Sequence, residues 1–119
     1  MRNISCLALD AVPTSSSATS SAIPVTQMTE GSVIITTAGD GSLSGSVKVQ
    51  ASNDISTGFP VQNFAPTNWV DVTNATVNVS GNGTVLLAPF AISYQYVRVV
   101  FTRSAGSGGT LTAAFNAGG

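Results

Sequence analysis

The sequence has no histidine and a single cysteine, Cys6, among its 119 residues. A lone cysteine cannot form an internal disulfide, and without histidine the usual zinc sites cannot be assembled. The commonest general base of enzyme catalysis is also missing. We therefore expect no metal, no cofactor and no enzymatic activity, and we interpret Cys6 as a small buried hydrophobe within an apolar run.

Charged residues are scarce as well. They make up 8% of the chain, whereas ordinary soluble domains carry about 25%. The four basic residues form no patch that could neutralise several phosphates, so we expect no nucleic acid partner. The five carboxylates show no paired spacing of the kind that glycosidases use. Such a surface belongs either to a soluble domain coated with Ser and Thr or to a subunit covered by its neighbours in a larger shell.

Long apolar runs are absent too. Ser, Thr, Asn or Gly interrupts every apolar stretch well before the roughly 18–20 residues that a membrane-spanning helix needs, so we expect no membrane association. The length suits one hydrophobic core rather than two. We expect a single domain over residues 1–119.

What the sequence does contain is a hydrophobic period of two, which is typical of half-buried β-strands. In residues 46–52, apolar side chains alternate with polar ones, and Ser52 falls on the polar face. Residues 95–103 repeat the pattern at the length of a central strand. The residues expected to face inward are Val47, Val49, Ala51, Val70, Val72, Val77, Val79, Val97, Val99, Phe101, Leu111, Ala113 and Phe115.

Three glycine-rich segments separate these strands, at residues 39–41, 81–83 and 105–109. Asn-Gly and Asp-Gly pairs tolerate the positive φ angles of tight hairpins, so the pattern predicts three antiparallel hairpins. Further strands are expected over residues 3–9 and near 23–28. The count of eight or nine strands with no helix predicts an all-β fold, a single antiparallel β-sandwich or jelly roll of about eight strands.

Two segments do not alternate. Residues 12–22 are rich in Ser and Thr and form either a loop or an extended arm that lies on another surface. Residues 53–68 contain Phe59 and Phe64, which either cap one end of the sandwich or make an intersubunit contact. Trp69, the only tryptophan, is either a core or sheet-edge anchor or an interface residue. Phe59, Phe64 and Trp69 are therefore the candidate interface residues.

Four segments of the chain form a recurring pattern of strand residues. They are Val47–Asp54, Asn68–Val72, Tyr96–Arg103 and Gly109–Thr112. Together they resemble small β-sandwich proteins encoded among the virion genes of tailed bacteriophages, in which a phrase of the form VQASND … W.DV … YVRVVFTR … GTLT recurs. The part of the chain through Gly31 lies outside the resemblance.

The resemblance implies a non-enzymatic virion protein that decorates or cements the capsid, with tail, neck and fibre components as near alternatives. It implies the major capsid protein or other virion proteins as partners, and the virion, assembled in the bacterial host cytoplasm, as the location. We expect a homo-oligomer in which residues 12–22 extend across a neighbouring subunit and add contact area.

A different class of function remains open from the residues alone. A carbohydrate-binding or host-recognition module needs exposed aromatic rings beside amide or acid groups. The residues that fit this description are Trp69, Tyr94 and Tyr96, with Asn68, Asp71 or Gln95 as their polar partners.

Overall fold

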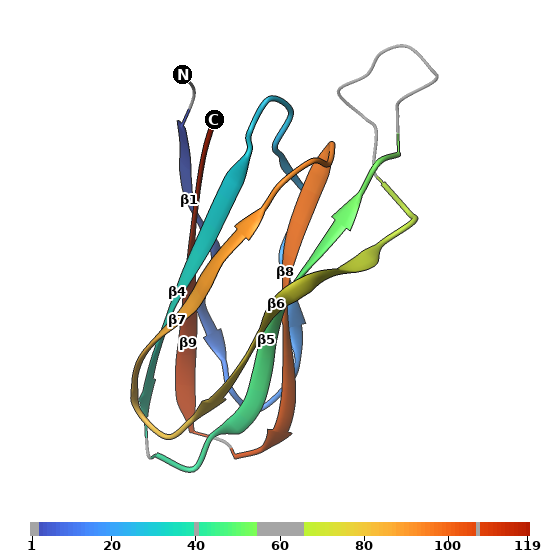
Figure 1. The fold of residues 1–119 in the computed structure, drawn as a ribbon. Coiled ribbons are helices and arrows are strands. Elements are labelled where there is room, and N and C mark those ends of the chain that lie inside the picture. The colour runs from blue at the N-terminus through green and yellow to red at the C-terminus, as the bar shows by residue number, and fades with distance from the viewer. Residues whose placement is uncertain (1–2, 40, 55–65, 107) are drawn as a thin grey trace.

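Two antiparallel β-sheets lie face to face in the computed structural model, which describes residues 3–39, 41–54, 66–106 and 108–119 (Figure 1). Within these residues the chain forms nine strand segments and no helix, so the expected all-β class is confirmed. The segments are β1 (Asn3–Pro13), β2 (Ala18–Thr19), β3 (Ile23–Pro24), β4 (Glu30–Gly39), β5 (Ser44–Ser52), β6 (Val70–Ser80), β7 (Gly83–Ala91), β8 (Tyr96–Ala105) and β9 (Gly109–Gly118).

The strand order is that of a jelly roll. The first sheet, here called sheet A, has the order β1-β9-β4-β7. The second, sheet B, has the order β2-β8-β5-β6, with β3 also paired to β8, so that β2 and β3 act as one interrupted strand. Apart from β5 and β6, which are neighbours in sheet B, the chain passes from one sheet to the other between successive strands. This gives eight strands in two sheets, the jelly-roll form of the sandwich.

The core lies between the sheets and follows the period of two. Alternate residues of the central strands β5, β8 and β9 are buried, and the polar residues between them face outward. Burial of these apolar side chains is the main favourable contribution to folding. The largest fully buried side chains are Phe101, Phe115, Ile35, Leu87, Leu111, Val25, Val33, Val47, Val49, Val97 and Val99.

Two positions depart from the expected alternation. Ser52, expected to face outward, is buried, and its hydroxyl accepts a hydrogen bond from the Asp54 amide at 3.1 Å where the chain leaves β5. Val70, expected to face the core, is 70% exposed although it lies opposite the buried Ala51. β6 is the edge strand of sheet B, and its first residue is left uncovered on the side that faces sheet A.

The three predicted hairpins are wrong in one respect. The glycine-rich segments do reverse the chain, but each joins a strand of one sheet to a strand of the other: β4 to β5, β6 to β7 and β8 to β9. Gly81 has a φ of 64°, and its amide donates to the Leu43 carbonyl at 2.9 Å. The turn between β6 and β7 is therefore bonded to the turn between β4 and β5. Turn chemistry specifies that the chain reverses, but not whether the next strand pairs beside the last or faces it about 10 Å away.

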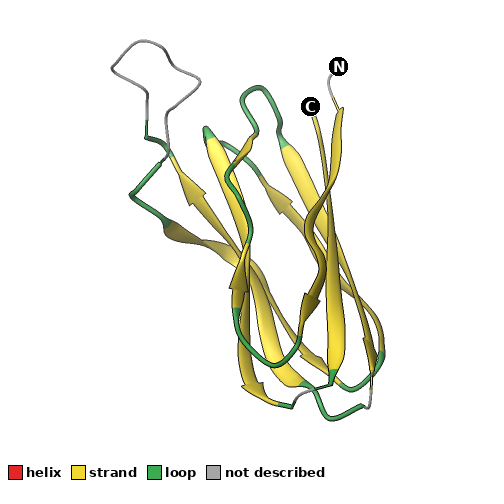
Figure 2. Cartoon of the chain, turned by 180° about the vertical axis from the view of Figure 1, so that it is seen from behind, coloured by secondary structure: helices red, strands yellow, loops and turns green. Residues whose placement is uncertain are grey.

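The Ser/Thr-rich segment 12–22 is held on its own domain rather than extended as an arm. Its middle forms β2 against β8, and the Ser20 hydroxyl accepts a hydrogen bond from the Val99 amide at 2.8 Å. The Ser17 hydroxyl accepts one from the Arg103 amide at 2.9 Å. Figure 2 shows this part of the chain from behind, with loops on either side of the short strands. The Ser17 and Ser20 hydroxyls thus accept hydrogen bonds from β8 amides that would bond to backbone carbonyls if β2 were longer.

The strand expected near residues 23–28 is shorter than predicted. It ends at Pro24, and the Val25 amide adds one more bond to the Gln95 carbonyl at 3.0 Å. Gln27 then takes a φ of 74°, and the Met28 amide bonds back to the Val25 carbonyl. Ile23, Val25 and Met28 are all buried, but only Ile23 belongs to the strand, and Val25 and Met28 lie in the turn that follows it.

Candidate functional site

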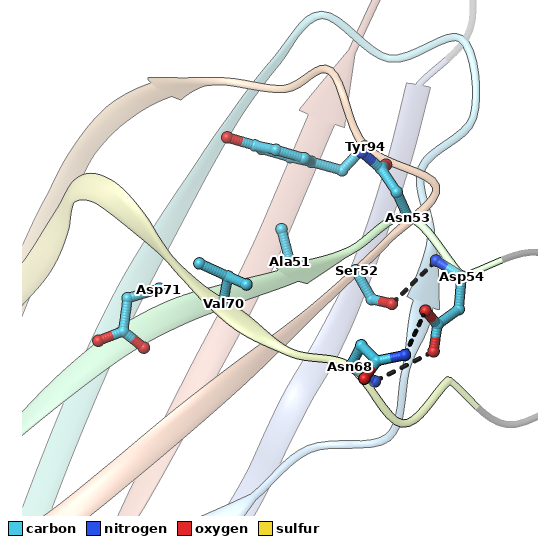
Figure 3. A pocket seen from close by; sticks show the side chains of 8 residues that line it. All are labelled: Ala51, Ser52, Asn53, Asp54, Asn68, Val70, Asp71 and Tyr94. Atoms are coloured by element: carbon cyan, nitrogen blue, oxygen red, sulfur yellow. Dashed lines mark hydrogen bonds between the residues drawn. The ribbon is translucent and has the colours of Figure 1, made fainter.

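A pocket of about 440 Å³ opens at the edge of sheet B, beside the first residue of β6 (Figure 3). Its floor is formed by the ends of β5 and β6, and the connection from β7 to β8 lies opposite. In Figure 3 the Ala51 and Val70 side chains point toward the Tyr94 ring, so one wall is apolar. The lining residues are Ala51, Ser52, Asn53, Asp54, Asn68, Val70, Asp71 and Tyr94.

One end of the pocket is organised by the carboxylate of Asp54. Its Oδ2 accepts hydrogen bonds from the backbone amides of Thr67 and Asn68 at 2.8 and 3.0 Å, and its Oδ1 accepts one from the Asn68 side chain at 3.0 Å. The bonds from the Asn68 side chain and the Thr67 amide hold the pKa of Asp54 below its ordinary value. This carboxylate therefore ties the two ends of the segment between β5 and β6 together.

The opposite wall is fixed by backbone contacts around Tyr94. The Gln95 amide donates to the Asn53 side-chain oxygen at 3.1 Å and to the Ser52 carbonyl at 3.2 Å. Tyr94 itself is half-buried and packs against the hydrophobic core. The pocket thus offers one tyrosine ring above an apolar floor, with amide groups at the rim.

The outer face of sheet B carries a polar network. Asp71 accepts a hydrogen bond from the Gln50 side-chain Nε2 at 2.9 Å and forms an ion pair with Lys48 at 3.2 Å. Gln50 in turn accepts a bond from Arg98 Nε at 2.8 Å, and the Arg98 guanidinium lies over the Trp69 ring. The bonds from Gln50 and then Lys48 lower the pKa of Asp71. Several of the few charges of this protein are therefore gathered on one side of the sandwich.

The outer face of sheet A is different, because its central rows hold no charged residue. The register places Leu7 opposite Ala114, Ala114 opposite Ile34, and Ile34 opposite Leu86, which makes one apolar row across all four strands. A polar row lies on each side of it. We call this surface the neutral face, and its residues are Ser5, Leu7, Ser32, Ile34, Thr36, Thr84, Leu86, Thr112, Ala114 and Asn116.

The neutral face is exposed despite its apolar row. Leu7, Ile34 and Leu86 are 55%, 48% and 58% exposed, and they are three of the four large hydrophobic residues that stand out from the described surface. A groove of about 490 Å³ runs beside Leu7 and Ile34. Contiguous apolar surface of this kind is typical of an interaction site rather than of a free monomer surface.

The sequence-predicted interface residues have separate outcomes. Phe59 and Phe64 lie outside the described residues. Trp69 is half-buried on the outer face of sheet B, where its ring stacks with Arg98 and its indole nitrogen donates to the Pro66 carbonyl at 3.2 Å. It is therefore a sheet-edge anchor rather than a core residue.

The prediction of a buried Cys6 is wrong. Cys6 lies on the edge strand β1 opposite Phe115 and is exposed beside the groove of the neutral face. Partial burial still raises the pKa of its thiol. The apolar run that contains Cys6 is a strand, as expected, but an edge strand leaves one of its sides open.

The neutral face is not visible in the sequence. Its four apolar residues come from four different strands and meet only through the strand register.

Among the described residues, no three or more His, Cys, Asp or Glu side chains gather as a metal ion would require. In the same part of the chain no helix is long and apolar enough to cross a membrane.

Comparison with known proteins yields little. No family model matches this chain, and no curated protein matches it. Five solved chains match, among them one from the structure of infectious bursal disease virus, Gx strain, with 14% identity and a TM-score of 0.41. The match covers 98% of this chain but 31% of the other, so the protein spans less than a third of the length of that chain. The likeness concerns the fold alone.

Proposed function

We propose that this protein is a non-enzymatic structural component of a virion, a decoration or cement protein on the capsid of a tailed bacteriophage. The observation that carries the proposal is the neutral face, an exposed and uncharged sheet surface with an apolar row across all four strands. Such a surface gains free energy when another protein covers it.

The distribution of charge supports the same function. Lys48, Asp71 and Arg98 lie on sheet B, whereas the central rows of the outer face of sheet A hold no charge and Glu30 stands at the start of β4, so the sheet B side is suited to solvent and the centre of the other side to contact. A cement protein acts by adding buried area between subunits that already touch. The resemblance of the strand segments to virion proteins of tailed phages supports the assignment independently. The jelly-roll fold is compatible with it, since viral capsid domains use this fold, although a fold alone does not specify function.

The test begins with purified phage particles from the host that carries the gene. Mass spectrometry of the particles should detect the protein in many copies, and electron cryo-microscopy should place its density on the capsid lattice. Particles from a phage that lacks the gene should release their DNA at a lower temperature, and supplying the protein in trans should restore the resistance. Density at the tail or neck would replace the capsid role with the tail alternative. Absence from the particles would contradict the virion role altogether.

A second function is favoured by one observation on the pocket. Tyr94, Asn68 and Asp71, three residues expected of a carbohydrate-binding site, line the same cavity. Trp69 is not part of this set, because it stacks with Arg98 on the outer face of sheet B. The Asp54 and Asp71 carboxylates already accept several internal hydrogen bonds, which leaves mainly the tyrosine ring and amide groups for a sugar.

A glycan array probed with the intact protein decides between the two functions. Binding that is lost in Tyr94→Ala and retained in Trp69→Ala would favour a host-recognition module. No signal on a broad array would remove the carbohydrate-binding alternative and leave the virion role as it stands.

A further inference from the structure

We propose that the neutral face is the interface of a two-fold symmetric dimer, in which it packs against the same face of a second copy of this chain. This inference rests on the proposed function, because the neutral face is the surface that carries that function and the dimer names a partner for it. In a two-fold dimer the same patch is used on both sides, so the surface must be complementary to itself.

The chemistry of the neutral face meets this requirement. None of its ten residues is charged, so two copies bring no like charges together at the centre of the interface, and Glu30, at the start of β4 on the same side of the sheet, lies outside that centre. A partner that offered a charged patch would have to bury that charge without a counterion, which is unfavourable. The rows beside the apolar one hold Ser, Thr and Asn side chains, which can both donate and accept hydrogen bonds and can therefore pair with their own kind. The partner of the face is thus an uncharged surface of mixed apolar and hydroxyl character, which a second copy provides.

The outer face of sheet A, of which the neutral face is the centre, is large enough for such an interface. Strands β4 and β9 have ten residues each. At about 3.3 Å per residue and about 4.8 Å between strands, four such strands cover roughly 600 Å² in projection, so the interface includes the rows at the ends of the neutral face, and Glu30 lies in one of them. A stable interface buries about 800 Å² of accessible surface per partner, and the accessible area of a side-chain surface exceeds its projected area. Two sheets that pack in this way lie within about 30° of alignment.

The edges of sheet A favour packing through the face rather than pairing strand to strand. The edge strand β1 has two register shifts, and Ala11 within it has a φ of 50°. On the opposite edge, β7 contains Pro89 and carries an extra residue where its pairing with β4 shifts register, between Leu87 and Phe90. Bulges and proline are devices that prevent a sheet from extending by a further strand. With both edges interrupted and the face uncharged, association through the face is the favoured mode.

The test is the oligomeric state of the intact chain in solution. Sedimentation velocity across a dilution series should give twice the 12.0 kDa of one chain at high concentration and a reversible shift toward the monomer on dilution. Ile34→Lys places an ammonium group in the apolar row of both copies, and we expect it to weaken the dimer by about a hundredfold or more. Val70→Lys makes the same change at an exposed valine outside the neutral face and should leave the dimer unchanged.

Folding of the variants is checked by circular dichroism and by denaturant unfolding. If Ile34→Lys does not fold, Thr36→Arg provides a second test, since Thr36 is an exposed residue of the same face. A wild-type chain that stays monomeric at the highest concentration overturns the proposal, as does a dimer that survives both substitutions or is lost in Val70→Lys. A monomer that still binds to particles would overturn the dimer and leave the proposed virion role intact. A dimer that forms in solution but is absent from particles would support the proposed dimer and contradict the proposed virion role.

Discussion

The guanidinium carbon of Arg98 lies 4.4 Å from the centroid of the Trp69 ring, so that a cation covers the only indole of the protein. Arg98 Nε also donates to the Gln50 side chain, which holds the guanidinium in place. The contact joins β8 to the start of β6 across the outer face of sheet B. It ties the residues that border the pocket to the central strands.

Removal of this cation should be visible in the tryptophan signal. Arg98→Ala is expected to cost about 0.5–1 kcal/mol from the cation–π contact, with a further contribution of about 1 kcal/mol from the lost hydrogen bond. Tryptophan fluorescence, excited where tyrosine does not absorb, reports on the contact directly because Trp69 is the only tryptophan. Arg103→Ala serves as the control, since Arg103 contacts the Gly106 carbonyl and not the indole. Identical emission spectra for the two variants would contradict the stacking.

Stability should depend on Asp54 in a pH-dependent way. Its pKa is lowered in the folded protein, chiefly by the Asn68 side chain and the Thr67 amide, so its contribution is present above the ordinary pKa of 3.8. As the pH falls through 3.8 toward the lower pKa of the folded state, protonation removes that contribution. The stability difference between wild type and Asp54→Asn should therefore be constant near neutral pH and shrink in acid. Denaturant unfolding over a pH series measures it, and a difference that does not change with pH would exclude this role.

Truncation of two neighbouring leucines on β7 should have effects of very different size on stability. Leu87 is 1% exposed and Leu86 is 58% exposed. Leu87→Ala removes core contacts and should destabilise the fold by about 2–5 kcal/mol. Leu86→Ala should change the stability of the dilute monomer by no more than about 0.5 kcal/mol. Denaturant unfolding of both variants at low protein concentration makes the comparison, and equal losses would show that the alternation along β7 is not as described.

The placement of residues 12–22 on their own domain can be tested through a hydroxyl. Ser20→Ala leaves the Val99 amide without its acceptor and should cost about 1–3 kcal/mol. Ser16→Ala alters an exposed hydroxyl of the same segment and should have little effect. Thermal unfolding of the two variants, together with hydrogen exchange at the Val99 amide, measures the outcome. If both variants unfold as the wild type does, the segment is not held as an extension of sheet B.

Much of the fold could be predicted from the sequence because burial imposes a period of two on a strand. Val97, Val99 and Phe101 were expected to face inward and do so, as were Leu111, Ala113 and Phe115. The all-β class follows from these patterns. The candidate sites were less accessible to prediction. Trp69 was recognised as a residue of interest, but its partner Arg98 is 29 positions away and is brought near by the pairing of β5 with both β6 and β8.

The sequence by itself determined the inward face of the central strands, where the chain reverses, and how few charges the surface can carry. These are local properties, set by side-chain chemistry and the geometry of a single strand. Only the tertiary structure decided that the glycine turns cross between sheets, and that Leu7, Ala114, Ile34 and Leu86 form one row. Pairing of strands distant in sequence depends on the packing of both sheets around one core. The sequence shows that charge is scarce, and the strand register shows that the central rows of the outer face of sheet A have none.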